Sequence, residues 1–173
     1  GHVEQLNKDK LLLQEVTEWL EANENCIPEH LLHLRPTTPL REPQIIEDAL
    51  KLFFQNKSEA SSLRSGHIAP ESPYKWFLKD SNNYFKGLMD NLTPERVNLP
   101  RQSFPSVYVP DGYIDILKSS VILNSGTLHG DKMLVFESPF CVEIDTEDDF
   151  KYLEYQLKKI GSNILDHYNN NRK

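Results

Sequence analysis

The segment from residue 30 to residue 65 constrains the fold more than any other part of the sequence. Residues 30–34 form a short apolar run, which predicts a buried strand because buried parallel strands lose the alternation of polar and apolar residues. A polar stretch at 35–41 follows, and Pro43 then stands in a first helical turn, where proline is tolerated. Residues 60–65 suit a second strand. This order of strand, loop, helix and strand predicts an α/β sheet with crossover helices.

Hydrophobic periodicity predicts the remaining elements. Apolar residues at three- and four-residue steps predict helices at 9–23, after Pro43 and after Thr146, which caps its helix. Strands are expected at 107–117, with an interruption at 110–112, at 133–136 and at 142–145. The predicted buried stripes are Leu12, Leu13, Val16, Trp19 and Leu20 in the first helix, Ile46, Ala49, Leu50 and Phe53 in the second, and Phe150, Leu153, Leu157 and Ile160 in the third.

Residues 79–105 interrupt this pattern. Pro94, Pro100 and Pro105 prevent long regular structure, and the sequence Asp-Ser-Asn-Asn at 80–83 predicts a turn. We expect an excursion from the sheet or an interface there. The asparagine-rich tail at 169–173 is expected to be disordered.

Charge and composition exclude several classes of function. The net charge is −7, from 26 acidic and 19 basic residues, so a general nucleic-acid binder is not expected. No apolar run reaches the roughly 20 residues that cross a bilayer, and the polar N-terminus does not look like a signal peptide. Cys26 and Cys141 lack metal-binding spacing and are predicted to be buried thiols, which suits a cytoplasmic protein.

The loop at 35–41 is a candidate ligand-binding segment. It holds Arg35, Thr37, Thr38 and Arg41 at the end of a predicted strand, which is the edge where ligands bind in open α/β sheets. Hydroxyls and guanidiniums suit a phosphate or carboxylate. The alternative is a proline-stiffened turn with solvated arginines, and the local sequence does not decide between them.

Two carboxylates near the last predicted strand are candidate metal ligands. Glu143 and Asp145 are two residues apart, so on a strand their side chains would share a face. Mg²⁺ is commonly held by one or two carboxylates together with substrate phosphates. The alternative is an acidic helix start capped by Thr146.

A third stretch runs from residue 99 to residue 116. Arg101 could hold an acid, and Gly112 within a strand indicates a close approach of the backbone to another group. The alternative is a bulged edge strand on which tyrosines pack.

Together these stretches resemble the acylneuraminate cytidylyltransferase family, which includes the CMP-sialic acid synthetases. Residues 34–41 (Leu-Arg-Pro-Thr-Thr-Pro-Leu-Arg) resemble its Leu-Gln-Pro-Thr-Ser-Pro-Leu-Arg motif. Residues 143–149 resemble its Asp-Ile-Asp-Thr-Glu-x-Asp motif. Residues 99–116 resemble its Arg-Gln…Pro…Tyr-Arg-Pro-Asn-Gly-Ala-Ile-Tyr stretch, and the three matches come in family order.

The resemblance implies a Rossmann-like nucleotidyltransferase core and a Mg²⁺-dependent reaction, in which a sugar hydroxyl attacks the α-phosphate of CTP and pyrophosphate leaves. The substrates would be CTP and an acidic nonulosonic sugar, and residues 79–105 would form the dimerisation excursion of a homodimer. The implied catalytic residues are Arg41 and Asp145, the substrate-binding residues Arg35, Thr37, Thr38, Arg101, Gln102 and Asp111, and the Mg²⁺ ligands Glu143 and Asp145.

Several positions depart from the family pattern. Arg35 replaces Gln, Val109 replaces Arg and Asp115 replaces Tyr; the other two departures are Asp111 for Asn and Glu143 for Asp. These changes leave the sugar open among sialic, legionaminic and pseudaminic acid types. A Kdo-type cytidylyltransferase and a non-catalytic assembly module on the same scaffold are the alternatives.

The Gly-rich, Lys/Arg-containing segment with which the family begins has no counterpart here. Residues 3–168 therefore resemble the C-terminal two-thirds of a cytidylyltransferase domain, with roughly 60 or more residues of the first βα units missing. We expect this segment alone to be inactive, because half of the phosphate cradle is absent.

Overall fold

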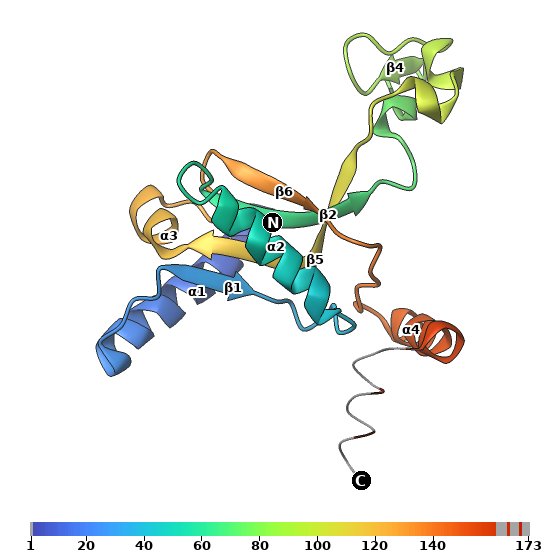
Figure 1. Cartoon of the computed structure of the whole chain (residues 1–173). Helices are drawn as coiled ribbons and strands as arrows, with labels where there is room; N and C mark the ends of the chain where they lie inside the picture. Colours follow the sequence, from blue (N-terminus) through green and yellow to red (C-terminus); the bar gives the residue numbers. More distant parts are fainter. Residues whose placement is uncertain (1, 162–165, 167–169, 171–173) are drawn as a thin grey trace. The chain divides into compact units, whose positions relative to one another are not determined.

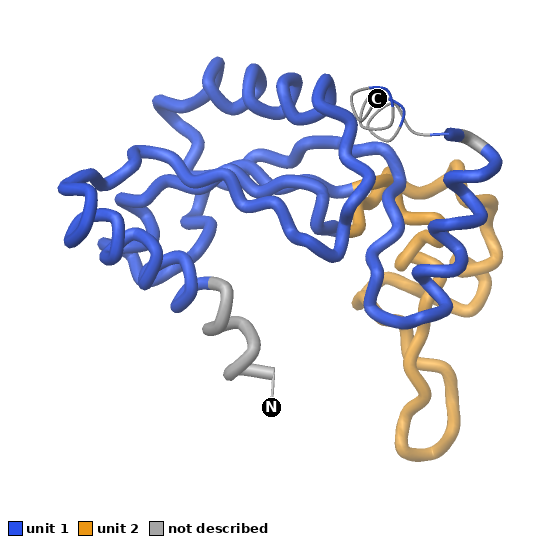
Figure 2. The backbone as a smooth tube through the Cα atoms, turned by 90° about the horizontal axis from the view of Figure 1, so that it is seen from below, with its two compact units in different colours: residues 1–66, 110–173 blue, residues 67–109 orange. Residues whose placement is uncertain are grey.

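The computed structural model describes residues 2–161, 166 and 170. The chain divides into two compact units (Figure 2), of which unit 1 comprises residues 1–66 and 110–173 and unit 2 comprises residues 67–109. Apart from Asn170, the tail predicted to be disordered lies outside the described residues. Among the described helices, none has the length and apolar character needed to span a membrane.

A four-stranded sheet forms the centre of unit 1 (Figure 1). Its order is β1 (His30–His33), β5 (Tyr108–Lys118), β2 (Ser62–Ile68) and β6 (Met133–Glu137). β1 pairs antiparallel with β5, and β2 pairs parallel with β6. Figure 1 shows β5 running opposite to β2, so β1 and β2 point the same way with β5 between them.

Helices cover both faces of this sheet. α2 (Pro43–Gln55) packs Ala49 and Phe53 against Leu63, Ile114 and Ile116, because its apolar residues recur on one side. On the other face, Leu13 of α1 (His2–Glu24) and Ile122 of α3 (Ser119–Ser125) pack against Leu117 of β5. The α/β class expected from the sequence is confirmed, with helices on both faces of a mixed sheet.

The last helix, α4 (Glu147–Ile160), begins as the sequence predicts. Thr146 and Asp149 form a capping box, in which each side chain hydrogen-bonds the backbone of the other residue. The Asp149 carboxylate also accepts from the Thr146 hydroxyl at 2.7 Å, and this bond, followed by those from the Thr146 and Asp145 amides, lowers the pKa of Asp149. Leu153 is buried, whereas Phe150 is exposed, so only part of the predicted stripe faces inward.

Several predictions about strands were wrong. Residues 142–145 form a loop, and β1 lies at the sheet's end, antiparallel to its neighbour and only partly buried. β5 continues through residues 110–112 without interruption.

Two predictions about buried side chains were also wrong. Leu12, Val16 and Trp19 of α1 are exposed, because Leu13 and Thr17 occupy the inward side of the helix. Cys26 is exposed rather than buried.

Unit 2 contains the segment 79–105 and is mostly irregular. Its regular elements are an antiparallel pair, β3 (Phe77–Lys79) and β4 (Phe85–Gly87), and three short 3₁₀ turns, Pro73–Lys75, Arg96–Asn98 and Arg101–Ser103. The predicted turn joins the two strands: the Asp80 carboxylate accepts hydrogen bonds from the backbone of Asn82 and Tyr84. Trp76, Phe77 and Tyr84 are exposed on this unit.

Candidate functional site

Two loops of unit 1 are joined by one backbone hydrogen bond. The amide of Ile144 donates to the carbonyl of Thr37 at 2.8 Å. The two loops, residues 35–41 and 139–146, carry the two candidate ligand-binding stretches, which are about a hundred positions apart in the sequence. This bond therefore places the candidate metal ligands beside the candidate phosphate-binding loop.

Gly112 of β5 lies at the point where these loops meet. A Cβ atom at this position would lie 2.7 Å from Thr38 Oγ1, 2.8 Å from Glu143 Oε1 and 2.9 Å from Arg35 Cδ. Atoms this close would clash, so the backbone can pass between the three side chains only because residue 112 has none. All three stretches singled out in the sequence thus contribute a residue to one place.

We expect Gly112→Ala to disturb the candidate site without removing any of its functional groups. The added methyl must displace the buried Thr38, so overpacking should lower the free energy of unfolding by about 1–3 kcal/mol. Chemical denaturation measures this loss. A Gly112→Ala variant as stable as wild type would contradict the close approach at Gly112.

Arg41 fixes the backbone of this site. Its Nε donates to the carbonyl of Tyr113 at 2.6 Å, and its Nη2 donates to the carbonyls of Arg35 and Gly112 at 2.5 and 2.7 Å. Burial lowers the pKa of this guanidinium, opposed by Cys141, Tyr113 and Asp111. In the structure Arg41 therefore holds the 35–41 loop against β5, and its predicted catalytic role remains a prediction.

Asp111 is likewise engaged within the fold. Its carboxylate is buried and accepts hydrogen bonds from Ser65 Oγ at 2.5 Å, Ser138 Oγ at 2.6 Å and the Tyr113 amide at 3.0 Å. Ser65 Oγ in turn accepts from the amide of Ile114. These contacts join β2, β5 and the start of the 139–146 loop, while substrate binding by Asp111 remains a prediction.

Glu143 and Asp145 are both exposed on the 139–146 loop. The backbone around Asp145 is held by the bond from Ile144 to Thr37 and by the Asp149 carboxylate, which accepts from the Asp145 amide at 3.2 Å and from the Thr146 amide at 2.8 Å. Exposed carboxylates on a loop held in this way are a donor set that suits Mg²⁺ shared with a phosphate. The described residues contain no cluster of three or more His, Cys, Asp or Glu that could hold a metal by itself.

Arg101 and Gln102 belong to unit 2. Arg101 donates to the carbonyls of Ala69 at 2.5 Å and Pro70 at 3.0 Å, and both residues line a cavity of about 370 Å³ within that unit. The other residues lining it are Ala69, Ser72, Phe104, Pro105, Ser106 and Val107. A sugar acid could be held there by the remaining guanidinium donors.

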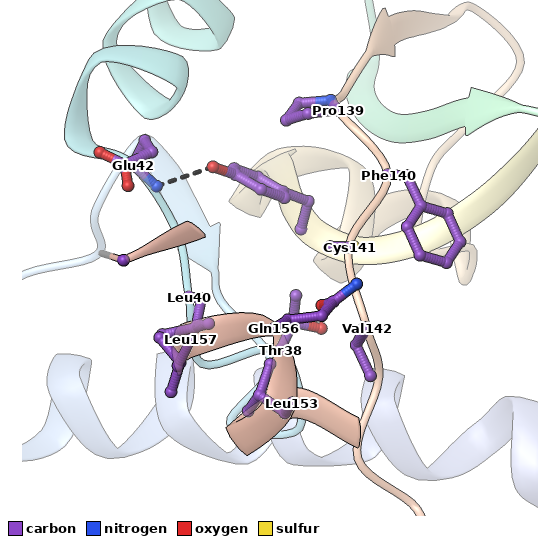
Figure 3. Close-up of a pocket in the computed structure, with 12 residues that line it drawn as sticks. Thr38, Leu40, Glu42, Pro139, Phe140, Cys141, Val142, Leu153, Gln156 and Leu157 are labelled. Carbon is purple, nitrogen blue, oxygen red and sulfur yellow. Dashed lines mark hydrogen bonds between the residues drawn. The ribbon is translucent and has the colours of Figure 1, made fainter. Parts of the chain in front are cut away.

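A smaller cavity of about 170 Å³ lies between the 35–41 loop, the 139–146 loop and α4 (Figure 3). Its lining is mainly apolar, and the Tyr113 hydroxyl accepts a hydrogen bond from the Glu42 amide at 2.8 Å. Burial, followed by Asp111 and Glu143, raises the pKa of Cys141 in this wall to about 12. The thiol is therefore protonated at neutral pH and is not a nucleophile.

Sequence reasoning missed a polar group on the sheet. Asp115 is buried and lies within 4 Å of side-chain nitrogens of His33, Arg35 and Arg64. The available signal was an aspartate between Ile114 and Ile116 in an otherwise apolar strand. His33 of β1 also belongs to this group.

The sequence matches no protein-family model and no curated protein. Among solved structures, the chain is similar to 4-diphosphocytidyl-2C-methyl-D-erythritol synthase from Anaerococcus prevotii, at 11% sequence identity and a TM-score of 0.48. The similarity covers 76% of this chain and 60% of that one. The chain thus spans less than two-thirds of the length of the structure that it matches.

Proposed function

We propose that the protein transfers CMP from CTP to an acidic nonulosonic sugar and releases pyrophosphate. The observation that carries the proposal is the meeting of Arg35, Thr38 and Glu143 around Gly112, beside the bond between Ile144 and Thr37. These residues come from the three stretches that resemble the acylneuraminate cytidylyltransferase family. Their meeting is what a single nucleotide and sugar site requires.

The chain's own residues would bind and orient the reactants. Arg35 and the Thr37 hydroxyl would contact the phosphates or the sugar acid, because a guanidinium and a hydroxyl donate to oxyanions. Thr38 Oγ1 has no hydrogen-bond partner among the described residues, so it is a candidate to bond a ligand that enters the site. Arg41 would keep the loop in place through its three carbonyl contacts.

Glu143 and Asp145 would hold Mg²⁺. When bound, the ion would offset the negative charge that builds on the transferring phosphate. In phosphoryl-type transfers most of the remaining rate enhancement comes from positioning, which here falls to the two joined loops. Arg101 and Gln102 would contact the acidic sugar, and unit 2 would form the interface of a homodimer.

The test is pyrophosphate release by the complete natural polypeptide, supplied with CTP, Mg²⁺ and a panel of acidic 2-keto sugars that includes Kdo. We expect turnover with a nonulosonic acid, and a loss of about 100-fold or more in kcat for Asp145→Ala. The matched control is Asp148→Ala, which removes a carboxylate 92% exposed on the first turn of α4 and should stay within about twofold of wild type.

An Asp145→Ala variant that keeps its rate in limiting Mg²⁺ would contradict the metal assignment. Turnover with Kdo alone would move the proposal to a Kdo-type cytidylyltransferase. If the complete polypeptide neither binds CTP nor releases pyrophosphate with any member of the panel, the protein is a non-catalytic module on this scaffold.

A further inference from the structure

Three neighbouring strands bring charged side chains onto one face of the sheet. His33 of β1 is paired in register with Asp115 of β5, so their side chains share a face, and His33 Nδ1 lies 3.7 Å from Asp115 Oδ2. Arg64 of β2, the next strand, places Nε 3.7 Å from Asp115 Oδ1. Arg35, just beyond the end of β1, places Nη2 3.9 Å from Asp115 Oδ2.

Two guanidiniums therefore face one buried carboxylate. Arg64 Nε faces Asp115 Oδ1 and Arg35 Nη2 faces Asp115 Oδ2, so the two cations approach different oxygens of the carboxylate. The Nε of Arg64 is itself buried. An anion from solvent can therefore reach only the exposed part of each guanidinium side chain.

His129 also belongs to this group, because it contacts Arg64, and its side chain carries no negative charge. Its Nε2 lies 3.4 Å from Nη1 of Arg64, which can only donate, so Nε2 accepts and the ring proton is on Nδ1, towards Ser62 Oγ at 3.3 Å. Burial and then the charges of Arg64, Arg35 and His33 lower the pKa of His129 to about 4. The ring is therefore neutral at physiological pH, chiefly because it is buried.

We propose that Arg64 and Arg35, held on either side of Asp115, form a binding site for a phosphate-type dianion on this face of the sheet. Their side chains are 26% and 31% exposed, so an anion can reach them, whereas Asp115 at 2% is out of its way. Two guanidiniums from different elements match the charge and the several acceptor oxygens of a phosphate. A ligand with one carboxylate would need only one guanidinium. The site shares Arg35 with the proposed function and adds Arg64 to it, so the inference rests in part on that function.

The experiment is a titration of the chain with inorganic phosphate at constant ionic strength, followed by NMR of the Arg64 Nε–H and the His129 ring. We expect saturable shifts at these groups, and at least tenfold weaker binding in Arg64→Gln. Arg64→Lys should recover part of the affinity because it keeps the charge. Lys51→Gln is the control: it removes the same charge from an exposed position on α2 and should bind as wild type.

The wild-type titration decides the proposal even if Arg64→Gln fails to fold. Absence of a saturable change at Arg64 and His129 would overturn it, as would an Arg64→Gln variant with wild-type affinity. Acetate that binds as tightly as phosphate would show a general anion patch and refute the dianion assignment. Phosphate binding without any CTP turnover would support this site while removing the proposed function.

Discussion

Replacing Arg41 by Gln should lower the free energy of unfolding by about 3–5 kcal/mol. The guanidinium donates to three backbone carbonyls, those of Arg35, Gly112 and Tyr113. A hydrogen bond to a charged group contributes about 1.5–3 kcal/mol, and a buried acceptor left without a donor costs about 1–3 kcal/mol. Gln has two donors and a shorter reach, so it cannot replace all three contacts. Urea denaturation followed by far-UV circular dichroism measures the change.

The control for this variant is Lys132→Gln, which removes a positive charge from an exposed position of the same unit. It should change the free energy of unfolding by no more than about 0.5 kcal/mol. If Arg41→Gln were as stable as this control and lost only activity, Arg41 would act on substrate rather than on the fold. The measurement therefore separates the scaffold role seen here from the catalytic role implied by the family resemblance.

Asp111→Ala should be destabilised to a similar degree, by about 3–5 kcal/mol. The substitution leaves Ser65 Oγ, Ser138 Oγ and the Tyr113 amide without their acceptor in a buried place, at about 1–3 kcal/mol for each. Ser65 cannot easily turn away, because its oxygen also accepts from the amide of Ile114. For a domain of this size the loss corresponds to a fall in Tm of roughly 10 °C.

Asp111→Asn is the informative partner of this variant. Asn keeps an oxygen that can accept from Ser65 and Tyr113, and its amide can donate to Ser138 if that hydroxyl rotates. We therefore expect a smaller fall in Tm than for Asp111→Ala. Calorimetry without substrate gives both values. Two variants as stable as wild type that fail to bind the sugar would instead support the substrate role predicted from the sequence.

The parts of the fold that could be predicted from the sequence depend on local interactions. α2 follows from Pro43 and a stripe ending at Phe53, and α4 follows from the Thr146 cap, because periodicity and capping involve residues within one or two turns. β6 at Met133–Glu137 was also predicted as a short strand. Each of these signals lies within the element that it specifies.

The errors arose where distant parts of the chain decide the outcome. Glu143 and Asp145 alternate as they would on a strand, but residues 142–145 form a loop whose backbone bond from Ile144 goes to Thr37, because strand formation needs a partner that the local sequence cannot supply. The exposed stripe of α1 shows the same limit. The helical periodicity was predicted correctly, but the contact with Leu117 and Ile122 decides that the side of α1 holding Leu13 is the buried one.

The sequence indicated which residues form the candidate site, but not which residues hold them in place. Thr37 and Glu143 were singled out because a hydroxyl can bind a phosphate and a carboxylate can bind a metal ion. The roles of Arg41 and Asp111 as scaffold residues depend mainly on partners 27 to 72 positions away in the sequence, which no local pattern reveals. Asp115 was visible in the sequence as an acid in an apolar strand, but nothing in the sequence indicated that Arg35 and Arg64 would contact it.

The bond between the Ile144 amide and the Thr37 carbonyl has a thermodynamic consequence. A ligand that orders one loop also restricts the other loop through this bond. The second loop then loses less conformational entropy when its own ligand binds. Occupation of the two loops should therefore be cooperative, and by linkage the enhancement must be the same in both directions. Because both groups are main-chain atoms, side-chain substitution alone does not remove them, and among the common residues only proline at 144 would eliminate the donor.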